Sequence, residues 1–262
     1  MTQVSSSGSD TFVLDQQISA LRPGKIVCVG RNYAAHAAEL NNPVPEEPIL
    51  FIKPASSLVM PDAEGLTSCP LHDAGSQHDE SLHYETEIAL LIGEQIGPDV
   101  AGDHRRLVDS VAGIGVALDL TKRELQSVLK KQGHPWELSK AFDGSCPVGS
   151  FVSPGRFIDK SQLEPNALWT ALGFDMRFNG ELRQQGRASQ MLTGCIELLS
   201  HISRHFTLNP GDLVLTGTPA GVGALMPGAV LEVSLGLAAE GVDDAAAPLA
   251  SVQQHTFRFA EA

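Results

Sequence analysis

Short runs of β-type residues recur along almost the whole chain, and this pattern constrains the fold more than any other feature of the sequence. The runs lie at residues 25–30, 49–60, 83–93, 111–120, 168–178, 181–183, 212–216, 230–235 and 256–259. Asn179-Gly180, between two of them, is a hairpin signal. The runs do not alternate with helices in the manner of a parallel βαβ sheet. We therefore expect an α+β fold with a β-dominated core.

Three segments are predicted to be helical. Residues 31–40 are rich in alanine and are followed by an Asn-Asn-Pro stop signal. Residues 121–132 begin with Thr121 and Glu124, which have the spacing of a capping box. Residues 189–206 carry apolar side chains at helical spacing, which favours an amphipathic helix packed on a sheet.

The chain is long enough, at 262 residues with 42% apolar content, to bury a large core in one domain. Residues 1–24 are predicted to be a partly ordered leader, and residues 25–262 a single domain. Residues 61–81 are aperiodic and rich in Gly, Pro, Ser and Asp, and are expected to form a loop. Residues 237–249 are predicted to be an insertion rich in Ala, Gly and Asp.

Composition narrows the class of function. The formal net charge of −13 opposes binding to the phosphates of nucleic acid. The N-terminal segment lacks the basic and apolar regions of a secretory signal, and no apolar run approaches the roughly 20 residues that span a bilayer. The 4 cysteines show no CxxC spacing, so neither a zinc site nor a disulfide framework is indicated. These features predict a cytoplasmic protein that binds neither membrane nor nucleic acid.

A pair of acidic residues marks the start of one predicted strand. Glu85 and Glu87 alternate with Thr86, so both side chains lie on one face, about 7 Å apart at their Cα atoms. On a solvated face they would have no special role. If the face is buried, their charges require a hard cation with oxygen ligands. Asp119, at the end of another predicted strand, is a candidate third ligand, although it could instead cap the following helix.

Several sequence blocks together resemble the fumarylacetoacetate hydrolase family. In chain order they are KIVCVGRNYAAHAAEL, LHYETEIALLIG, GVALDLTKRELQ, KKQGHPWELSKAFDGSCPVG, FNGELRQQG and GDLVLTGTPAGVG. They cover about residues 25–235, and the resemblance is strongest to the short acylpyruvase branch, which also includes oxaloacetate decarboxylases. It implies a mixed β-roll or sandwich-like α+β domain with a few peripheral helices, which is commonly a homodimer.

The resemblance also implies roles for individual residues. Glu85, Glu87 and Asp119 would hold one Mg²⁺ or Mn²⁺ per subunit. His36 and Glu39, three residues apart on a predicted helix, would activate water, whereas spacing alone favours a surface pair.

Further residues of the implied site are cationic or belong to loops. Lys140 resembles the active-site lysine of the family, and Arg123 its contact to the substrate carboxylate. Gly217 and Thr218 lie in the implied substrate loop, with Gln184 as a weaker candidate. Lys53 would support the site from outside. Lys122 departs from the small residue that is usual in relatives, so the size or charge of the substrate could differ.

Three hypotheses on function follow from these residues. The first is hydrolysis of the C–C bond of a 3-acylpyruvate, a small anionic 2-oxo acid, to pyruvate and a carboxylic acid. The second uses the same metal site to decarboxylate oxaloacetate, or to isomerise or hydrate a longer 2-oxo diacid from aromatic catabolism. The third is a non-catalytic scaffold, which the converging acidic residues argue against.

Overall fold

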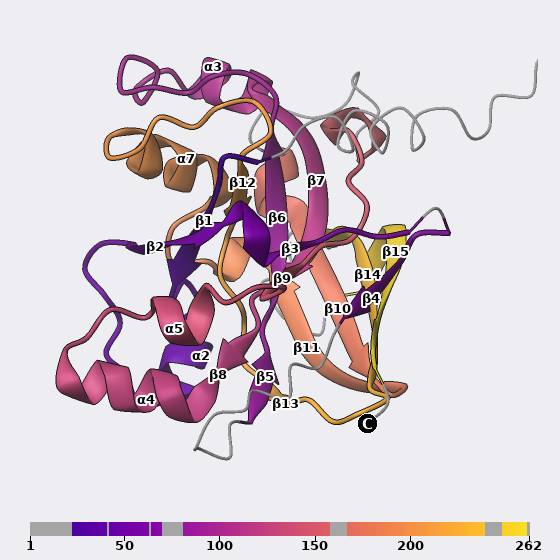
Figure 1. Cartoon of the computed structure of the whole chain (residues 1–262). Coiled ribbons are helices and arrows are strands. Elements are labelled where there is room, and N and C mark those ends of the chain that lie inside the picture. The colour runs from indigo at the N-terminus through magenta and orange to yellow at the C-terminus, as the bar shows by residue number, and fades with distance from the viewer. Residues whose placement is uncertain are drawn as a thin grey trace, which may run out of the picture.

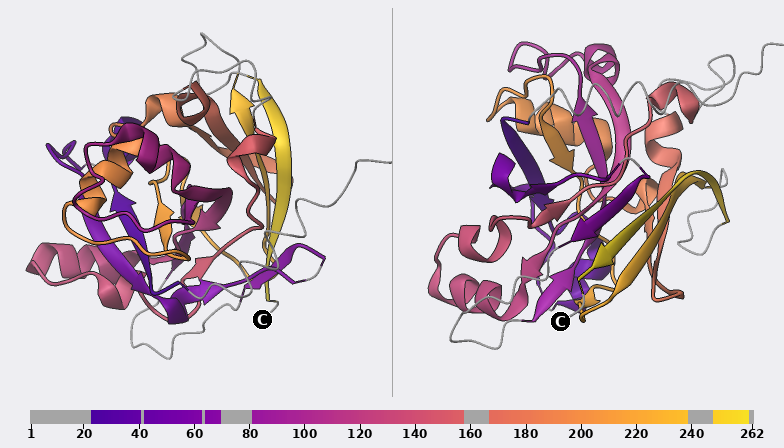
Figure 2. Two further views of the ribbon diagram at one scale, coloured as in Figure 1. Left: turned by 90° about the horizontal axis from the view of Figure 1, so that it is seen from above. Right: turned by 45° about the vertical axis from the view of Figure 1, so that its right-hand side comes forward.

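Two five-stranded sheets form the framework of the protein in the computed structural model, which describes residues 23–40, 42–62, 64–69, 81–157, 167–238 and 248–260. The strand order is β2-β1-β12-β6-β7 in the first sheet and β11-β10-β14-β15-β4 in the second. Seen from above, the strands curve around the centre of the molecule, and helices lie at the periphery (Figures 1 and 2). The predicted α+β class with a β-dominated core is confirmed.

The first sheet mixes parallel and antiparallel pairs. Its strands are β1 (Lys25–Gly30), β2 (Ile49–Pro54), β6 (Thr86–Ile92), β7 (Val111–Leu118) and β12 (Leu213–Leu215). β1 is parallel to β12 and antiparallel to β2, and β6 is antiparallel to both β12 and β7. Every residue of β6 is buried, in keeping with its nearly continuous apolar sequence. This sheet carries most of the candidate site.

The second sheet includes β14 and β15, which have 9 and 11 residues and are the longest strands in the described ranges. Its strands are β4 (Leu66–Cys69), β10 (Leu172–Phe178), β11 (Glu181–Arg187), β14 (Val230–Ala238) and β15 (Leu249–Phe259). β10 and β11 form the hairpin predicted at Asn179-Gly180, where both residues have the positive φ that such a turn requires (48° and 84°). Inward-facing residues of the two sheets belong to one large apolar cluster, which includes Ile88, Phe174, Leu231 and Phe257. Their burial fixes the frame around the site.

The smaller elements surround this frame. Two minor sheets join β13 (Gly223–Ala224) to β5 (Leu82–Tyr84) and β8 (Thr121–Lys122), and β3 (Leu58–Val59) to β9 (Cys146–Pro147). The α-helices are α2 (Ala34–Glu39), α3 (His104–Asp109), α4 (Arg123–Gln132), α5 (Glu137–Lys140), α6 (Ala167–Ala171) and α7 (Cys195–Ser203). None of the helices in the described ranges could span a membrane.

Some predicted elements are wrong in part. The segment 61–81 is not all loop, because β4 pairs in parallel with β15. The segment 168–178 begins as helix α6 and becomes strand only at Leu172. The helix predicted over 189–206 is shorter, and its regular part is α7.

The capping box of α4 is also wrong. Thr121 pairs with His83 in a small sheet, and its hydroxyl donates to the carbonyl oxygen of Asp119. Glu124 accepts hydrogen bonds from Ser81 instead of the helix start. Neither the Thr121 hydroxyl nor the Glu124 carboxylate therefore makes the hydrogen bond that a capping box would require.

The predicted leader and parts of two loops lie outside the described residues. They are residues 1–22 of the leader, residues 70–80 of the first loop and residues 239–247 of the insertion. Leu237 and Ala238 belong to β14, and Leu249 begins β15, so the ends of the predicted insertion are strand. The division into a leader and one domain stays a prediction.

Candidate metal centre and active site

The three predicted acidic ligands meet in the structure. Glu85 lies between β5 and β6, Glu87 lies in β6, and Asp119 directly follows β7. The antiparallel register pairs Glu87 with Ala117, and the Asp119 N–H donates to the Glu85 carbonyl oxygen over 2.8 Å. All three residues are buried, and one ligand atom of each lies within 4.8 Å of the others. Strand pairing therefore converts the E-x-E sequence and a distant aspartate into one oxygen-rich cluster.

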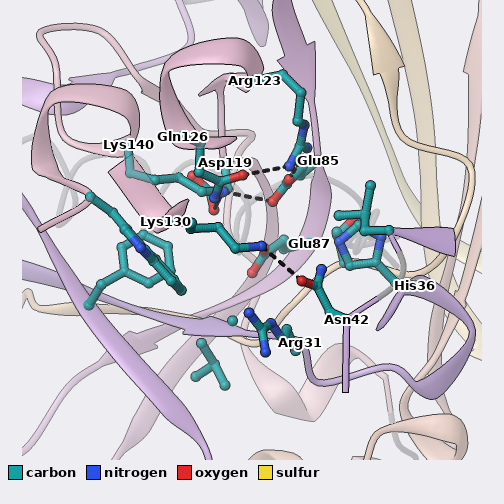
Figure 3. A pocket seen from close by; sticks show the side chains of 16 residues that line it. Arg31, His36, Asn42, Glu85, Glu87, Asp119, Arg123, Gln126, Lys130 and Lys140 are labelled. Atoms are coloured by element: carbon teal, nitrogen blue, oxygen red, sulfur yellow. Dashed lines mark hydrogen bonds and ion pairs between the residues drawn. The ribbon is translucent and has the colours of Figure 1, made fainter. Parts of the chain in front are cut away.

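Buried cations approach the same cluster. Lys140 Nζ donates to Glu85 Oε2 (2.8 Å), to Asp119 Oδ2 (2.5 Å) and to the Thr121 hydroxyl. Lys53, fully buried in β2, lies 2.9 Å from Asp119 Oδ1, although no donor is aligned for a hydrogen bond with that oxygen. Arg123 forms an ion pair with the other oxygen of Glu85 (Figure 3).

Charge is distributed unevenly among the three acidic residues. Burial would raise the pKa of Glu85, but Lys140 and Arg123 outweigh it and lower that pKa. Burial raises the pKa of Glu87, and the neighbouring Asp119 and Glu85 raise it further. Glu87 has no ion pair among the described residues, and its one hydrogen bond comes from the Gly217 N–H over 2.6 Å. The cluster thus retains a poorly compensated carboxylate.

This arrangement fits a divalent cation. The donor set is three carboxylates, which are the ligands that Mg²⁺ and Mn²⁺ prefer. The cluster lines a pocket, so a cation held there would keep positions open for a small ligand. The uncompensated Glu87 and the unaligned Asp119 Oδ1 are the atoms that such a cation would satisfy.

His36 and Glu39 of α2 lie at the same pocket. His36 Nδ1 is 3.1 Å from Glu39 Oε2, and the imidazole is largely buried. The second oxygen of Glu39 accepts a hydrogen bond from the Gly221 N–H over 3.0 Å. One side chain thus orients the imidazole and connects α2 to the loop after β12. His36 lines the pocket (Figure 3), so its other nitrogen, Nε2, remains for a bound molecule.

The predicted substrate loop reaches the pocket through Thr218. The Thr218 hydroxyl donates to the Thr86 carbonyl oxygen and accepts from Gln184 Nε2, in each case over 2.8 Å. Gln184 is buried behind Thr218 and does not line the pocket, so it holds the loop in place. Gly217 has a φ of +96°, a backbone conformation that favours glycine, and this directs its N–H to Glu87.

Other residues of the pocket were not predicted from the sequence. Those with polar or aromatic side chains are Arg31, Asn42, Gln126, Lys130, Phe51 and Trp136. Helical spacing gave a signal for two of them, because Gln126 and Lys130 follow Arg123 by three and seven residues on α4. No sequence signal indicated Arg31, because the direction of its side chain depends on a positive φ of 58°.

Comparison with known proteins gives consistent results. The family model for the fumarylacetoacetate (FAA) hydrolase C-terminal domain matches residues 25–249. Oxaloacetate tautomerase YcgM of Escherichia coli (strain K12) is 44% identical over 210 residues, which are 80% of this chain and 87% of the relative. The mitochondrial oxaloacetate decarboxylase of Dictyostelium discoideum is 38% identical over 211 residues, with coverages of 80% and 88%.

A solved structure shows the same fold with a metal bound. The crystal structure of fumarylpyruvate hydrolase from Pseudomonas aeruginosa in complex with Mn²⁺ and pyruvate aligns with a TM-score of 0.73 and 30% sequence identity. The alignment covers 92% of this chain and 91% of that one. The sheet framework, the buried acidic cluster and these matches together show that the chain belongs to the fumarylacetoacetate hydrolase family.

Proposed function

We propose that this protein catalyses the keto–enol tautomerisation of oxaloacetate with a bound Mg²⁺ or Mn²⁺. The observation that carries the proposal is the buried cluster of Glu85, Glu87 and Asp119 beside an oriented imidazole, in a chain 44% identical to an oxaloacetate tautomerase. The reaction needs a proton carrier and a means of stabilising negative charge, and the pocket offers both. It needs no water.

The cation would be held by the three carboxylates. When bound, it would supply Lewis acidity toward the 1-carboxylate and 2-oxo oxygens of the substrate, which makes the C3 hydrogens more acidic. Lys140 is ion-paired to both Glu85 and Asp119. Its positive charge would therefore lie close to the oxygens of a bound substrate. Lys53 holds Asp119 from the other side.

His36 is the proposed proton carrier. Its Nδ1 is engaged by Glu39, so Nε2 is the atom that takes a proton from C3. Glu39 stabilises the imidazolium that results and fixes the orientation of the ring. The C3–H bond breaks, a C2–C3 double bond forms, and the proton passes to the former carbonyl oxygen. Lys140 offsets the negative charge that develops on that oxygen. No atom is gained or lost overall.

Hydrolysis of a 3-acylpyruvate is the second candidate. The same His36–Glu39 pair could activate water, and the structural similarity to a fumarylpyruvate hydrolase supports this activity. Decarboxylation of oxaloacetate, supported by the Dictyostelium discoideum relative, would use the same cations. The three activities differ in their products: tautomerisation releases nothing, whereas the other two release pyruvate.

One assay separates them. The purified protein, with Mg²⁺ or Mn²⁺ added, is mixed with the enol form of oxaloacetate, and its ultraviolet absorbance and the release of pyruvate are followed together. We expect the enol signal to decay faster than without enzyme, with no extra pyruvate. The pyruvate readout is repeated with acetylpyruvate, fumarylpyruvate, maleylpyruvate and oxaloacetate, and release of fumarate is followed with fumarylacetoacetate. Pyruvate from an acylpyruvate would favour hydrolysis instead.

A matched pair of variants tests the role of the cluster. Asp119→Asn keeps the size of a buried ligand and should abolish the acceleration. Asp109→Asn makes the same change on the exposed side of α3, where the side chain is 66% accessible, and should leave the rate unchanged. If the protein treated with a chelator accelerates the reaction as well as the metal-loaded protein, the proposed function is wrong.

A further inference from the structure

Two cations of the pocket lie apart from the acidic cluster. Arg31 follows β1, and Lys130 lies in the last turn of α4. Both are half-buried and line the same pocket as the acidic residues, and neither forms an ion pair with any described residue. In Figure 3, Arg31 lies on the side opposite Arg123, and Lys130 lies between them, with its amine directed to Asn42. Neither cation is therefore directly paired with a carboxylate of the cluster.

The position of Lys130 follows from helix geometry. It lies seven residues, or about two turns, after Arg123 and shares its face of α4. Its Nζ donates one hydrogen bond, over 2.8 Å, to the side-chain oxygen of Asn42, which is a neutral acceptor. An ammonium group has three hydrogens, so two remain for a bound molecule. Asn42 fixes the amine in place without neutralising it.

Arg31 is held in an uncommon backbone conformation. Its φ of 58° is in the left-handed region, which costs a residue with a side chain about 1 kcal/mol. The adjoining backbone is ordered by Asn32, whose amide donates to the carbonyl oxygens of Thr193 and Thr216. No hydrogen bond holds the Arg31 guanidinium to a described residue, and this leaves its planar set of donors for an anion.

The two cations also repel each other. Burial lowers the pKa of Lys130, and the nearby charges of Arg31 and Arg123 lower it further. The charge of Glu85 raises the pKa of Lys130 but does not offset these effects. Lys140 shows the opposite behaviour, because Asp119 and Glu85 outweigh the effect of burial and raise its pKa. Lys130 thus has no directly paired anion among the described residues, whereas Lys140 is already paired with Glu85 and Asp119.

We infer that Arg31 and Lys130 form a subsite for a second carboxylate, so that the pocket selects dianionic four-carbon 2-oxo diacids over 2-oxo acids with one carboxylate. The first carboxylate and the oxo group would face the acidic cluster and its cation, and the distal carboxylate would lie between the guanidinium and the ammonium groups. This assignment rests on the proposed function, because it takes its substrate class from oxaloacetate. It adds the residues that would bind the distal carboxylate of the substrate.

Binding of inert analogues tests the subsite without turnover. Malate and 2-hydroxybutanoate have the same four carbons and the same 2-hydroxy acid group, but carbon 4 is a carboxylate in malate and a methyl group in 2-hydroxybutanoate. Calorimetric titration of the Mg²⁺-loaded protein at fixed ionic strength gives Kd for each. We expect Lys130→Gln and Arg31→Gln each to weaken malate binding about tenfold, as loss of a charge-assisted hydrogen bond predicts. Binding of 2-hydroxybutanoate should change less than twofold.

Matched variants make the test specific. Lys131→Gln removes the same charge from the neighbouring, exposed residue of α4, and should leave both Kd values unchanged. Lys130→Arg keeps the charge and should retain most of the malate affinity. Wild-type protein that binds the two ligands equally, or variants that weaken both equally, would overturn the subsite. A protein that prefers malate but does not tautomerise oxaloacetate would refute the proposed function and leave the subsite standing.

Discussion

Replacing Glu87 by glutamine should stabilise the metal-free protein and remove its response to metal. Glutamine keeps the size of the side chain and an oxygen that accepts from the Gly217 N–H. It removes the one carboxylate of the cluster that has no ion pair among the described residues. The same change deletes a proposed ligand, so the effects on metal-free and metal-loaded protein should have opposite signs.

The size of the effect follows from the geometry. Two charges 4.8 Å apart, the limit of separation within the cluster, repel by about 3 kcal/mol at an effective dielectric constant of about 20. Lys140 and Lys53 offset part of this, so we expect a net gain of about 1–3 kcal/mol in the free energy of unfolding without metal. That corresponds to a rise in Tm of about 2–6 °C for a chain of this size. Mg²⁺ at one hundred times its Kd should stabilise only the wild type, by about 2.7 kcal/mol.

The gain in stability from Glu87→Gln should increase with pH. Burial, Asp119 and Glu85 raise the pKa of Glu87 in the folded protein. A group whose folded pKa is raised contributes stability below its unfolded pKa, about 4.3, and this contribution is lost as the pH rises. The advantage of the glutamine variant should therefore be small near pH 4 and grow toward neutral pH.

Thermal unfolding with chelator and with Mg²⁺, for wild type and variant, measures both effects. Glu94→Gln, an exposed change just after β6, is the matched control and should alter neither value. A variant that is less stable than wild type in chelator, or that gains as much from Mg²⁺, would refute the electrostatic account of the cluster.

Three further changes test other parts of the site. His36→Gln should lower kcat by a factor of about 10²–10⁴ while leaving the Mg²⁺-induced rise in Tm unchanged, because it removes only the proton carrier. Lys53→Met should reduce the free energy of unfolding in chelator by about 3–5 kcal/mol, because it leaves Asp119 with one fewer buried cation; an unchanged denaturation midpoint would contradict the ion pair. Gly221→Ala should lower both Tm and kcat, since its φ is +97° and a Cβ there would lie 2.0 Å from the Arg183 carbonyl oxygen; thermal unfolding and steady-state kinetics measure the two effects.

Local sequence signals predicted much of the fold where the structure they describe is itself local. The strand β1 and the Asn179-Gly180 hairpin both depend on a few adjacent residues. Pairings between distant segments could not be predicted in this way. β4 is a strand because it pairs with β15, almost two hundred residues later, and nothing in its own four residues requires it.

In the candidate site, too, local features were predictable and the contacts between distant segments were not. The E-x-E pattern predicted that Glu85 and Glu87 share a face, but Asp119 joins them only because β6 and β7 pair in one particular register. The roles of the site residues came from resemblance to a family and stay predictions. So does the homodimer, which a measurement of molar mass in solution would test.

The hydrogen bond between Glu39 and the Gly221 N–H has a consequence for reading kinetic data. α2 has only six residues, too few to be stable by itself. This hydrogen bond therefore helps to fix the position of the His36 imidazole. A substitution in the loop after β12 will move the proton carrier as well as the wall of the pocket. KM and kcat should then change together, and a mutation that looks like a defect in substrate recognition will also be a defect in proton transfer.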